Sequence, residues 1–146
     1  MSIVFRLPLF LLFAVPISLF DIREFRIPDV LTLGGIALFL LLHILLPGGS
    51  VLGTAVEYAV AFAAFWLLHR FTKGRMGLGD AKYSALIAAA VGITSWFLAL
   101  FIASVAGIFF ALARMGMRKA DRGTRIPFAP FLSLGAALSM IVRGPG

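Results

Sequence analysis

The chain has 146 residues, of which 62% are hydrophobic, with a mean hydropathy of +1.07 and a formal net charge of +7. Soluble domains contain roughly 45–50% apolar residues, so this composition excludes an ordinary soluble domain and predicts an integral membrane protein. The chain has no cysteine, which excludes disulfides, thiolate–zinc sites and cysteine nucleophiles.

Six apolar runs follow one another and predict six membrane helices. The first covers residues 3–20; a signal peptide is the competing interpretation, but no A-x-A site precedes the charged stretch DIREFRIPD. The other runs cover residues 30–47, 51–68, 80–91, 96–113 and 126–142. A run of 18 residues forms a helix of about 27 Å, close to the hydrocarbon thickness, whereas the fourth run is short. Backbone groups in lipid must be satisfied within each segment, so we predict an all-α fold with one membrane-embedded domain over residues 1–146.

The basic residues predict the orientation of these helices. The gaps after the first, third and fifth runs, together with Lys82, contain eleven of the 13 Lys and Arg residues, and the other side has only Arg6 and Arg143. Cytoplasmic loops carry this excess in membrane proteins, so both termini are expected outside the cytoplasm. Membrane orientation and contact with anionic lipid headgroups therefore account for the positive net charge. A nucleic-acid partner is not needed to explain it.

Two of the six acidic residues are candidates for catalysis. Asp21 ends the first run and Asp80 begins the fourth, so the predicted topology places both at the cytoplasmic end of the helices. Two carboxylates that face each other share a proton; one then acts as a general base on water while its protonated partner donates to the carbonyl under attack. A helix cap or solvated helix end is the ordinary alternative. For Asp80, Gly77 and Gly79 weaken that alternative, because glycine permits unusual backbone angles and close approach of another chain.

The other acidic residues have structural interpretations. Asp29 is expected in the first turn of the second helix, where a carboxylate is favoured. Glu24 and Asp121 are expected to balance neighbouring basic residues. Glu57 lies inside the third run, and we favour a structural ion pair with His43 over a functional intramembrane acid.

Three motifs together resemble the type IV prepilin peptidase family. GLGD at residues 77–80 matches the GxGD signature of intramembrane aspartyl proteases. FDIREFRIPDVLT at 20–32 is similar to the family's D-x-R-x-x-x-I-P-[DN] element, and RIPFAPFLSLGA at 125–136 resembles its P-F-[GA]-P-F-L segment. They occur in family order across essentially the whole chain. The resemblance implies an aspartic endopeptidase that removes short basic leaders from prepilin-like or pseudopilin precursors at the cytoplasmic face of a prokaryotic inner membrane.

The resemblance also implies roles for particular residues. Asp21 and Asp80 match the catalytic aspartates, and neither a metal nor another cofactor is implied. The supporting motif positions are Gly77, Gly79, Lys82, Arg23, Ile27 and Pro28, and the positions expected to shape the site are Pro127, Phe128 and Pro130. Larger family members also methylate the new N-terminus, using a cytoplasmic domain with a cysteine zinc site. Because this chain has no cysteine and its first predicted cytoplasmic loop covers only residues 21–29, we expect no methyltransferase domain.

Two further hypotheses concern the acidic residues as a group. A six-helix transporter or ion pathway is the alternative function, and it predicts acids near the bilayer midplane rather than at the cytoplasmic face. Under the peptidase hypothesis, a local negative patch is expected to receive the basic leader; it consists of Asp21, Glu24, Asp29 and Asp80. The sequence leaves open the precursor's identity and the oligomeric state.

Overall fold

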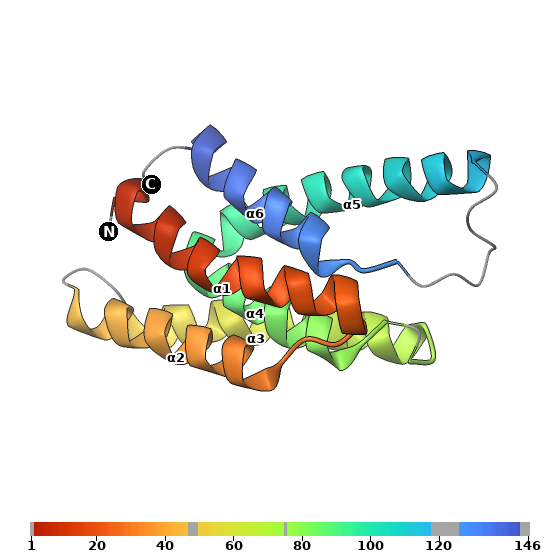
Figure 1. The fold of residues 1–146 in the computed structure, drawn as a ribbon. Coiled ribbons are helices and arrows are strands. Elements are labelled where there is room, and N and C mark those ends of the chain that lie inside the picture. Colours follow the sequence, from red (N-terminus) through yellow and green to blue (C-terminus); the bar gives the residue numbers. More distant parts are fainter. Residues whose placement is uncertain (1, 47–49, 75, 118–125, 144–146) are drawn as a thin grey trace.

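The computed structural model describes residues 2–46, 50–74, 76–117 and 126–143. All regular structure in these ranges is helical, which confirms the predicted all-α fold (Figure 1). The helices are α1 (Ile3–Glu24), α2 (Asp29–Leu45), α3 (Val51–Phe71), α4 (Leu78–Val91), α5 (Ile93–Gly116) and α6 (Ala129–Arg143). Among the described residues, α1, α3 and α5 are long and apolar enough to cross a membrane, while α2 and α6 are shorter apolar helices.

Successive helices run in opposite directions along the bundle. In Figure 1, α1, α3 and α5 run from left to right, and α2, α4 and α6 return. From α1 to α5, short connections favour antiparallel packing of consecutive helices. The ends of α1, α3 and α5 therefore lie with the starts of α2, α4 and α6 at one end of the molecule, called the site end below. The start of α1 and the end of α6 lie at the opposite end.

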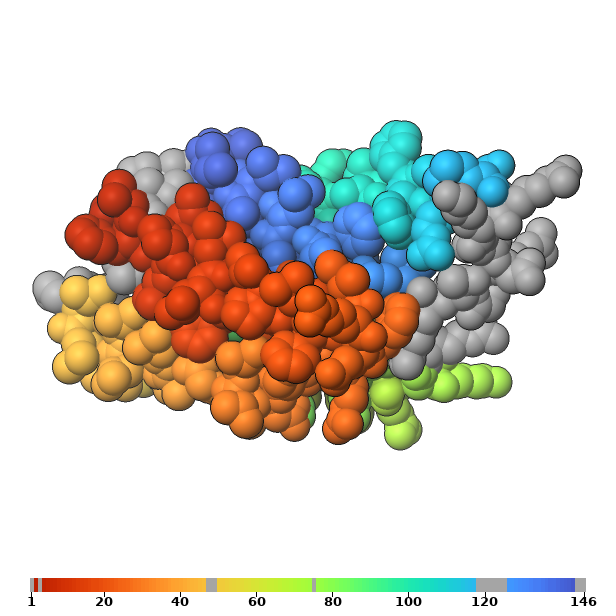
Figure 2. All heavy atoms as spheres, in the orientation of Figure 1, coloured from red at the N-terminus to blue at the C-terminus, as the bar shows by residue number. Residues whose placement is uncertain are grey.

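The short helix α4 forms the centre of the bundle. Ala81 and all residues from Tyr83 to Ala90 are buried. The helix packs against α2, α3, α5 and α6, and Figure 2 shows it almost hidden behind α1, α2 and α6. A helix buried on all sides must be apolar all round, and the five alanines of α4 let its neighbours approach closely. Its 14 residues extend about 21 Å, so the prediction of a short fourth helix is confirmed.

A glycine fixes the close packing of α6 on α5. A Cβ atom at Gly135 would overlap the backbone carbonyl of Ala99, and would lie only 3.2 Å from the backbone nitrogen of Ala103. The two helices therefore approach to a distance that no side chain at this position permits. This contact anchors α6, so that its first turn is held at the site end of the bundle.

The predicted ion pair between His43 and Glu57 is wrong. His43 Nδ1 lies 2.8 Å from the carbonyl oxygen of Phe39, one turn earlier in α2. Within the described part of the chain, no hydrogen bond or ion pair joins His43 to Glu57. His43 is two residues from the end of α2 and Glu57 six residues from the start of α3, which corresponds to a difference in depth of about 6 Å. His43 is therefore too far from the depth of Glu57, and its Nδ1 bonds instead to the carbonyl of Phe39 in its own helix.

Candidate active site

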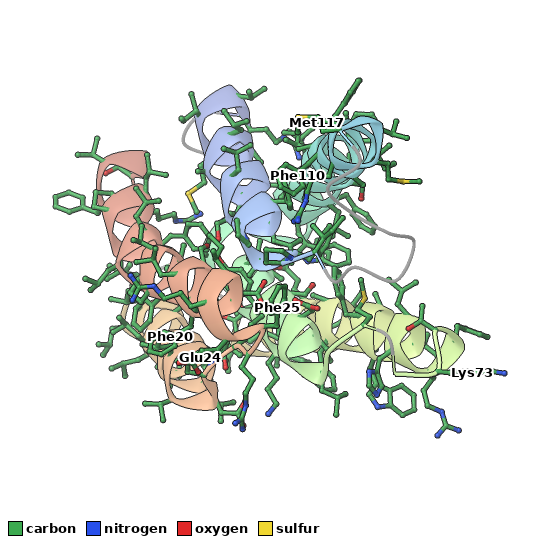
Figure 3. All side chains as sticks on the ribbon, turned by 45° about the vertical axis from the view of Figure 1, so that its right-hand side comes forward. Phe20, Glu24, Phe25, Lys73, Phe110 and Met117 are labelled. Atoms are coloured by element: carbon green, nitrogen blue, oxygen red, sulfur yellow. The ribbon has the colours of Figure 1, made fainter. Side chains whose placement is uncertain are left out.

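The chain leaves α1 through a left-handed turn at Phe25. Phe25 has a φ of 51°, and its N–H donates to the carbonyl of Asp21 at 3.0 Å. A residue other than glycine pays a conformational cost in this region, and such strain is concentrated at functional sites. Glu24 and Phe25 lie where α1 ends, between the start of α2 and α4 (Figure 3). The turn directs the following segment, Arg26–Pro28, across the start of α4.

Asp21 is buried against the start of α6. Its side chain lies in the last turn of α1 and the residue is only 6% exposed. Its Oδ2 accepts a hydrogen bond of 3.0 Å from the backbone N–H of Ala129, the first residue of α6. N–H groups in a first helical turn have no acceptor in their own helix, and the positive end of the helix dipole favours a negative charge there. The fold thus supplies a backbone donor to a carboxylate 108 positions earlier in the chain.

Asp80 lies in the first turn of α4, and a glycine beside it makes room for the segment after α1. A Cβ on Gly79 would lie 3.0 Å from the Cβ of Ile27, closer than side chains normally approach. The segment that approaches this glycine is thus the protein's own Ile27, and room for another chain at Gly77 and Gly79 stays a prediction. The expectation of unusual backbone angles is wrong, because neither Gly77 nor Gly79 has a positive φ. A Cβ on Gly77 would lie 3.8 Å from Asp80 Oδ2, an ordinary contact.

A pocket of about 730 Å³ at the site end contains both aspartates. Its lining residues are Phe20, Asp21, Glu24, Phe25, Arg26, Ile27, Pro28, Asp29, Gly77, Leu78, Gly79, Asp80, Lys82, Ile126 and Phe128. Among the described residues, the lining includes four carboxylates and two basic side chains, although the whole chain carries a net charge of +7. The described lining is therefore acidic within a basic protein, and the pocket brings together the two aspartates from separate helices.

Most of the predicted site residues meet in this pocket. Eight of them line it: Asp21, Ile27, Pro28, Gly77, Gly79, Asp80, Lys82 and Phe128. Arg23, Pro127 and Pro130 do not; Arg23 is exposed on α1, and Pro130 is the second residue of α6. The sequence analysis missed Ala129, which acts through its backbone, and no side-chain pattern signals such a donor. It also missed the apolar lining residues Phe20, Phe25, Leu78 and Ile126.

An ion pair joins α2 and α4 at the rim of the pocket. Lys82 Nζ lies 2.7 Å from Asp29 Oδ1, and the two side chains are 32% and 59% exposed. Asp29 is in the first turn of α2, as predicted. Exposed pairs of this kind contribute about 0–1 kcal/mol to stability, so the pair matters more for the charge of the rim than for the fold.

The pocket provides acid–base groups rather than a preformed metal site. Within the described residues, no group of three or more His, Cys, Asp and Glu side chains is arranged to hold a metal ion. Two carboxylates at the end of a helical bundle, next to a pocket large enough for a peptide segment, are suited to activating water.

Sequence comparison relates this arrangement to known proteins. The model of the type IV leader peptidase family matches residues 8–112, well over half of the chain and including both aspartates. The chain belongs to the type IV leader peptidase family. The match ends before the Phe128–Ala129 segment, so the contact between Asp21 and α6 is a finding of the structure alone. No solved structure matches this leader peptidase family member.

Curated relatives of this leader peptidase family member are named prepilin leader peptidase/N-methyltransferase. That of Aeromonas hydrophila is 28% identical over 132 residues, covering 87% of this chain and 46% of the relative. That of Pectobacterium carotovorum is 31% identical over 139 residues, covering 90% and 49%. That of Pseudomonas aeruginosa is 30% identical over 129 residues, covering 85% and 44%. The chain thus spans about half the length of these relatives, and its family and apolar helices indicate a multi-pass membrane protein.

Proposed function

We propose that the chain is a membrane aspartic endopeptidase that cleaves the leader from type IV prepilin-like or pseudopilin precursors. Asp21 and Asp80 are the catalytic pair. The observation that carries the proposal is that both aspartates line one acidic pocket, in a chain that belongs to the type IV leader peptidase family. The relatives' names supply the substrate class.

In the proposed reaction, the aspartates share one proton. The ionised carboxylate takes a proton from water, and the resulting hydroxide attacks the scissile carbonyl carbon, while the protonated carboxyl donates its proton to the carbonyl oxygen. Collapse of the tetrahedral intermediate breaks the carbon–nitrogen bond; the proton taken from water passes to the leaving amine, and a hydroxyl of the intermediate returns a proton to the carboxylate that had donated one. Water is consumed, both carboxyl groups return to their starting states, and no covalent enzyme intermediate forms.

We place the pocket at the cytoplasmic face of the cytoplasmic membrane, with six spanning helices and both termini on the other side. Several described basic residues lie at the site end, namely Arg23, Arg26, Arg70, Lys73 and Lys82. Lys73 extends away from the bundle at the end of α3 (Figure 3). Clusters of Lys and Arg at this end accord with a cytoplasmic location and with anionic headgroups nearby. A precursor whose leader is still in the cytoplasm reaches a pocket on this side directly.

The proposal covers the peptidase reaction and not the methyl transfer named for the relatives. The chain has no cysteine for the zinc site that accompanies methylation in larger members. The proposed activity thus requires no S-adenosylmethionine.

The test uses the purified chain in liposomes with a leader-bearing precursor. We expect a shortened product whose new N-terminus, determined by mass spectrometry, lies at the end of the basic leader. The transporter alternative is tested in the same vesicles by cation flux. Flux without cleavage would overturn the peptidase proposal, and the position of both aspartates at the end of the bundle rather than at its middle favours cleavage.

The acidic side chains at the rim of the pocket, Glu24 and Asp29, are expected to favour binding of precursors with basic leaders. Reversing charge at Glu24 and Asp29 together is expected to raise KM for a basic leader, whereas Lys82→Gln frees Asp29 and is expected to lower KM. We expect each change in KM to be roughly two- to fivefold, which corresponds to the energy of one exposed ion pair. The change in KM is expected to become smaller with added salt, because solvent ions screen exposed charges. Steady-state kinetics at low and high ionic strength provide the measurement. A precursor whose leader Lys and Arg residues are changed to Gln is the control, and the rim variants should not change its KM; an unchanged KM with the basic leader would refute the role of the rim.

A further inference from the structure

Three hydroxyl groups meet inside the bundle, one each from α1, α4 and α6. Ser133 Oγ on α6 lies 2.7 Å from Ser18 Oγ on α1, and it is also hydrogen-bonded to the Tyr83 hydroxyl on α4. The Ser133 hydroxyl donates its own hydrogen to the carbonyl of Ala129 at 2.8 Å. A serine hydroxyl has one hydrogen and two acceptor sites, so Ser18 and Tyr83 are the donors to Ser133. Every hydrogen-bonding site of Ser133 is thereby used.

Each hydroxyl lies one helical turn from a group of the candidate active site. Ser18 precedes Asp21 by three residues, Tyr83 follows Asp80 by three, and Ser133 follows Ala129 by four. Residues three or four apart lie on the same face of a helix, and one turn corresponds to about 5 Å along its axis. The hydroxyls therefore form a layer beneath the aspartates, deeper in the bundle. Tyr83 is fully buried.

The two helices that carry the aspartates depend on α6 for their relative position. Within the described helices, α1 packs chiefly on α6 and α2, whereas α4 packs on α2, α3, α5 and α6, and α1 and α4 share little direct packing. Ser133 is bonded to both of them, and it lies one turn beyond the backbone donor to Asp21. Loss of its hydroxyl removes the polar link between α1 and α4 and leaves the half-buried Ser18 and the buried Tyr83 without this acceptor, which is costly for the buried Tyr83 hydroxyl.

We propose that Ser133, with Tyr83 as its partner, is a positioning residue that holds α1 and α4 at the separation at which Asp21 and Asp80 act on one water. The inference rests on the proposed function, because only a reaction that uses both aspartates depends on this separation. The hydroxyls do not line the pocket, so they affect the reaction step and not the binding of the precursor.

The test compares matched variants in leader cleavage. Ser133→Ala and Tyr83→Phe are each expected to lower kcat by roughly 10- to 100-fold, the scale of a misplacement of up to about 1 Å, with KM within about twofold of wild type. Ser139→Ala is the serine control, since Ser139 is buried on the same helix and bonds to the carbonyl of Ala136 in that helix. Tyr58→Phe is the tyrosine control, since the buried Tyr58 hydroxyl has no hydrogen-bond partner among the described residues. Both controls are expected to keep the wild-type kcat.

A conservative variant separates positioning from folding. Ser133→Thr keeps the hydroxyl and is expected to retain most of the wild-type kcat. Threonine can make the same bond, since the Thr32 hydroxyl donates to the carbonyl of Pro28, four residues earlier. The double variant Ser133→Ala/Tyr83→Phe is expected to lose no more than the worse single variant, because both remove one interaction. If Ser133→Ala does not fold, Tyr83→Phe and Ser133→Thr carry the test.

The outcomes distinguish this inference from the proposed function. Wild-type kcat in both Ser133→Ala and Tyr83→Phe, equal losses in the two controls, or a raised KM with unchanged kcat would each overturn the inference and leave the peptidase proposal standing. A wild-type chain that cleaves no leader-bearing precursor would overturn the proposed function, and the inference with it.

Discussion

Asp21→Asn and Asp80→Asn are each expected to lower kcat for leader cleavage by roughly 10²–10⁴-fold, the usual contribution of a general acid or base. An amide cannot exchange the proton that the mechanism requires. Asparagine is a better choice than alanine at position 21, because its carbonyl oxygen can still accept the hydrogen bond from Ala129 N–H. The measurement is steady-state cleavage by purified variants, with thermal unfolding to show that the fold is kept.

Glu57→Gln is the matched control for these variants. It makes the same change from acid to amide in α3, at a residue that does not line the pocket, and is expected to retain wild-type kcat. The double variant Asp21→Asn/Asp80→Asn is expected to be no slower than the slower single variant, because groups that act as a unit have non-additive effects. Cleavage at the wild-type rate by either single variant would remove that aspartate from the mechanism.

Gly79→Ala is expected to lower kcat by up to about 10-fold, because a displacement of about 1 Å at a reacting group costs about 100-fold and the added Cβ requires a shift of only a few tenths of an ångström. The added Cβ would lie 3.0 Å from Ile27 Cβ, so the segment after α1 must move away from the start of α4. This movement displaces the short segment that follows α1, which lines the pocket together with Asp21. Ile27→Ala is not expected to rescue the variant, because the nearest atom is the Cβ that alanine retains.

Gly77→Ala is the control for the neighbouring glycine. Its Cβ would lie 3.8 Å from Asp80 Oδ2, and Gly77 has a φ of −69°, so alanine fits both the space and the backbone. We expect kcat within a few-fold of wild type. Equal losses in the Gly77 and Gly79 variants would show that the motif acts through glycine flexibility rather than through the contact with Ile27.

The sequence predicted the helices and both aspartates because these depend on patterns along the chain. Apolar runs interrupted by basic gaps predict the helices, and Asp21 and Asp80 are singled out because, among only six acidic residues, they share a predicted position at the same end of the helices. The predicted positions of the helix ends were less accurate. The first run was assigned to residues 3–20, but α1 continues to Glu24, because the polar residues after Phe20 form one more turn before Phe25 reverses the chain.

Contacts across the bundle could not be predicted from single residue types. The N–H of Ala129 has no counterpart in a side-chain pattern, and Pro127 and Pro130 indicated the segment without indicating the atom that bonds to Asp21. The prediction that His43 pairs with Glu57 was wrong for a different reason. Two ionisable residues at a similar predicted depth were joined, whereas the actual partner is a backbone carbonyl in the same helix as His43.

The site end of the bundle has a consequence for how the pocket tolerates its own charge. Three helices begin there: α2 at Asp29, α4 at Leu78 and α6 at Ala129. Each start carries a partial positive charge of about half a unit, and Asp29, Asp80 and Asp21 each lie at one of them. The backbone thus adds to the stabilisation of these carboxylates, beside the contribution that Lys82 makes to Asp29. A protein rich in Lys and Arg can in this way keep an anionic pocket, and no single side-chain substitution removes the helix starts that sustain it.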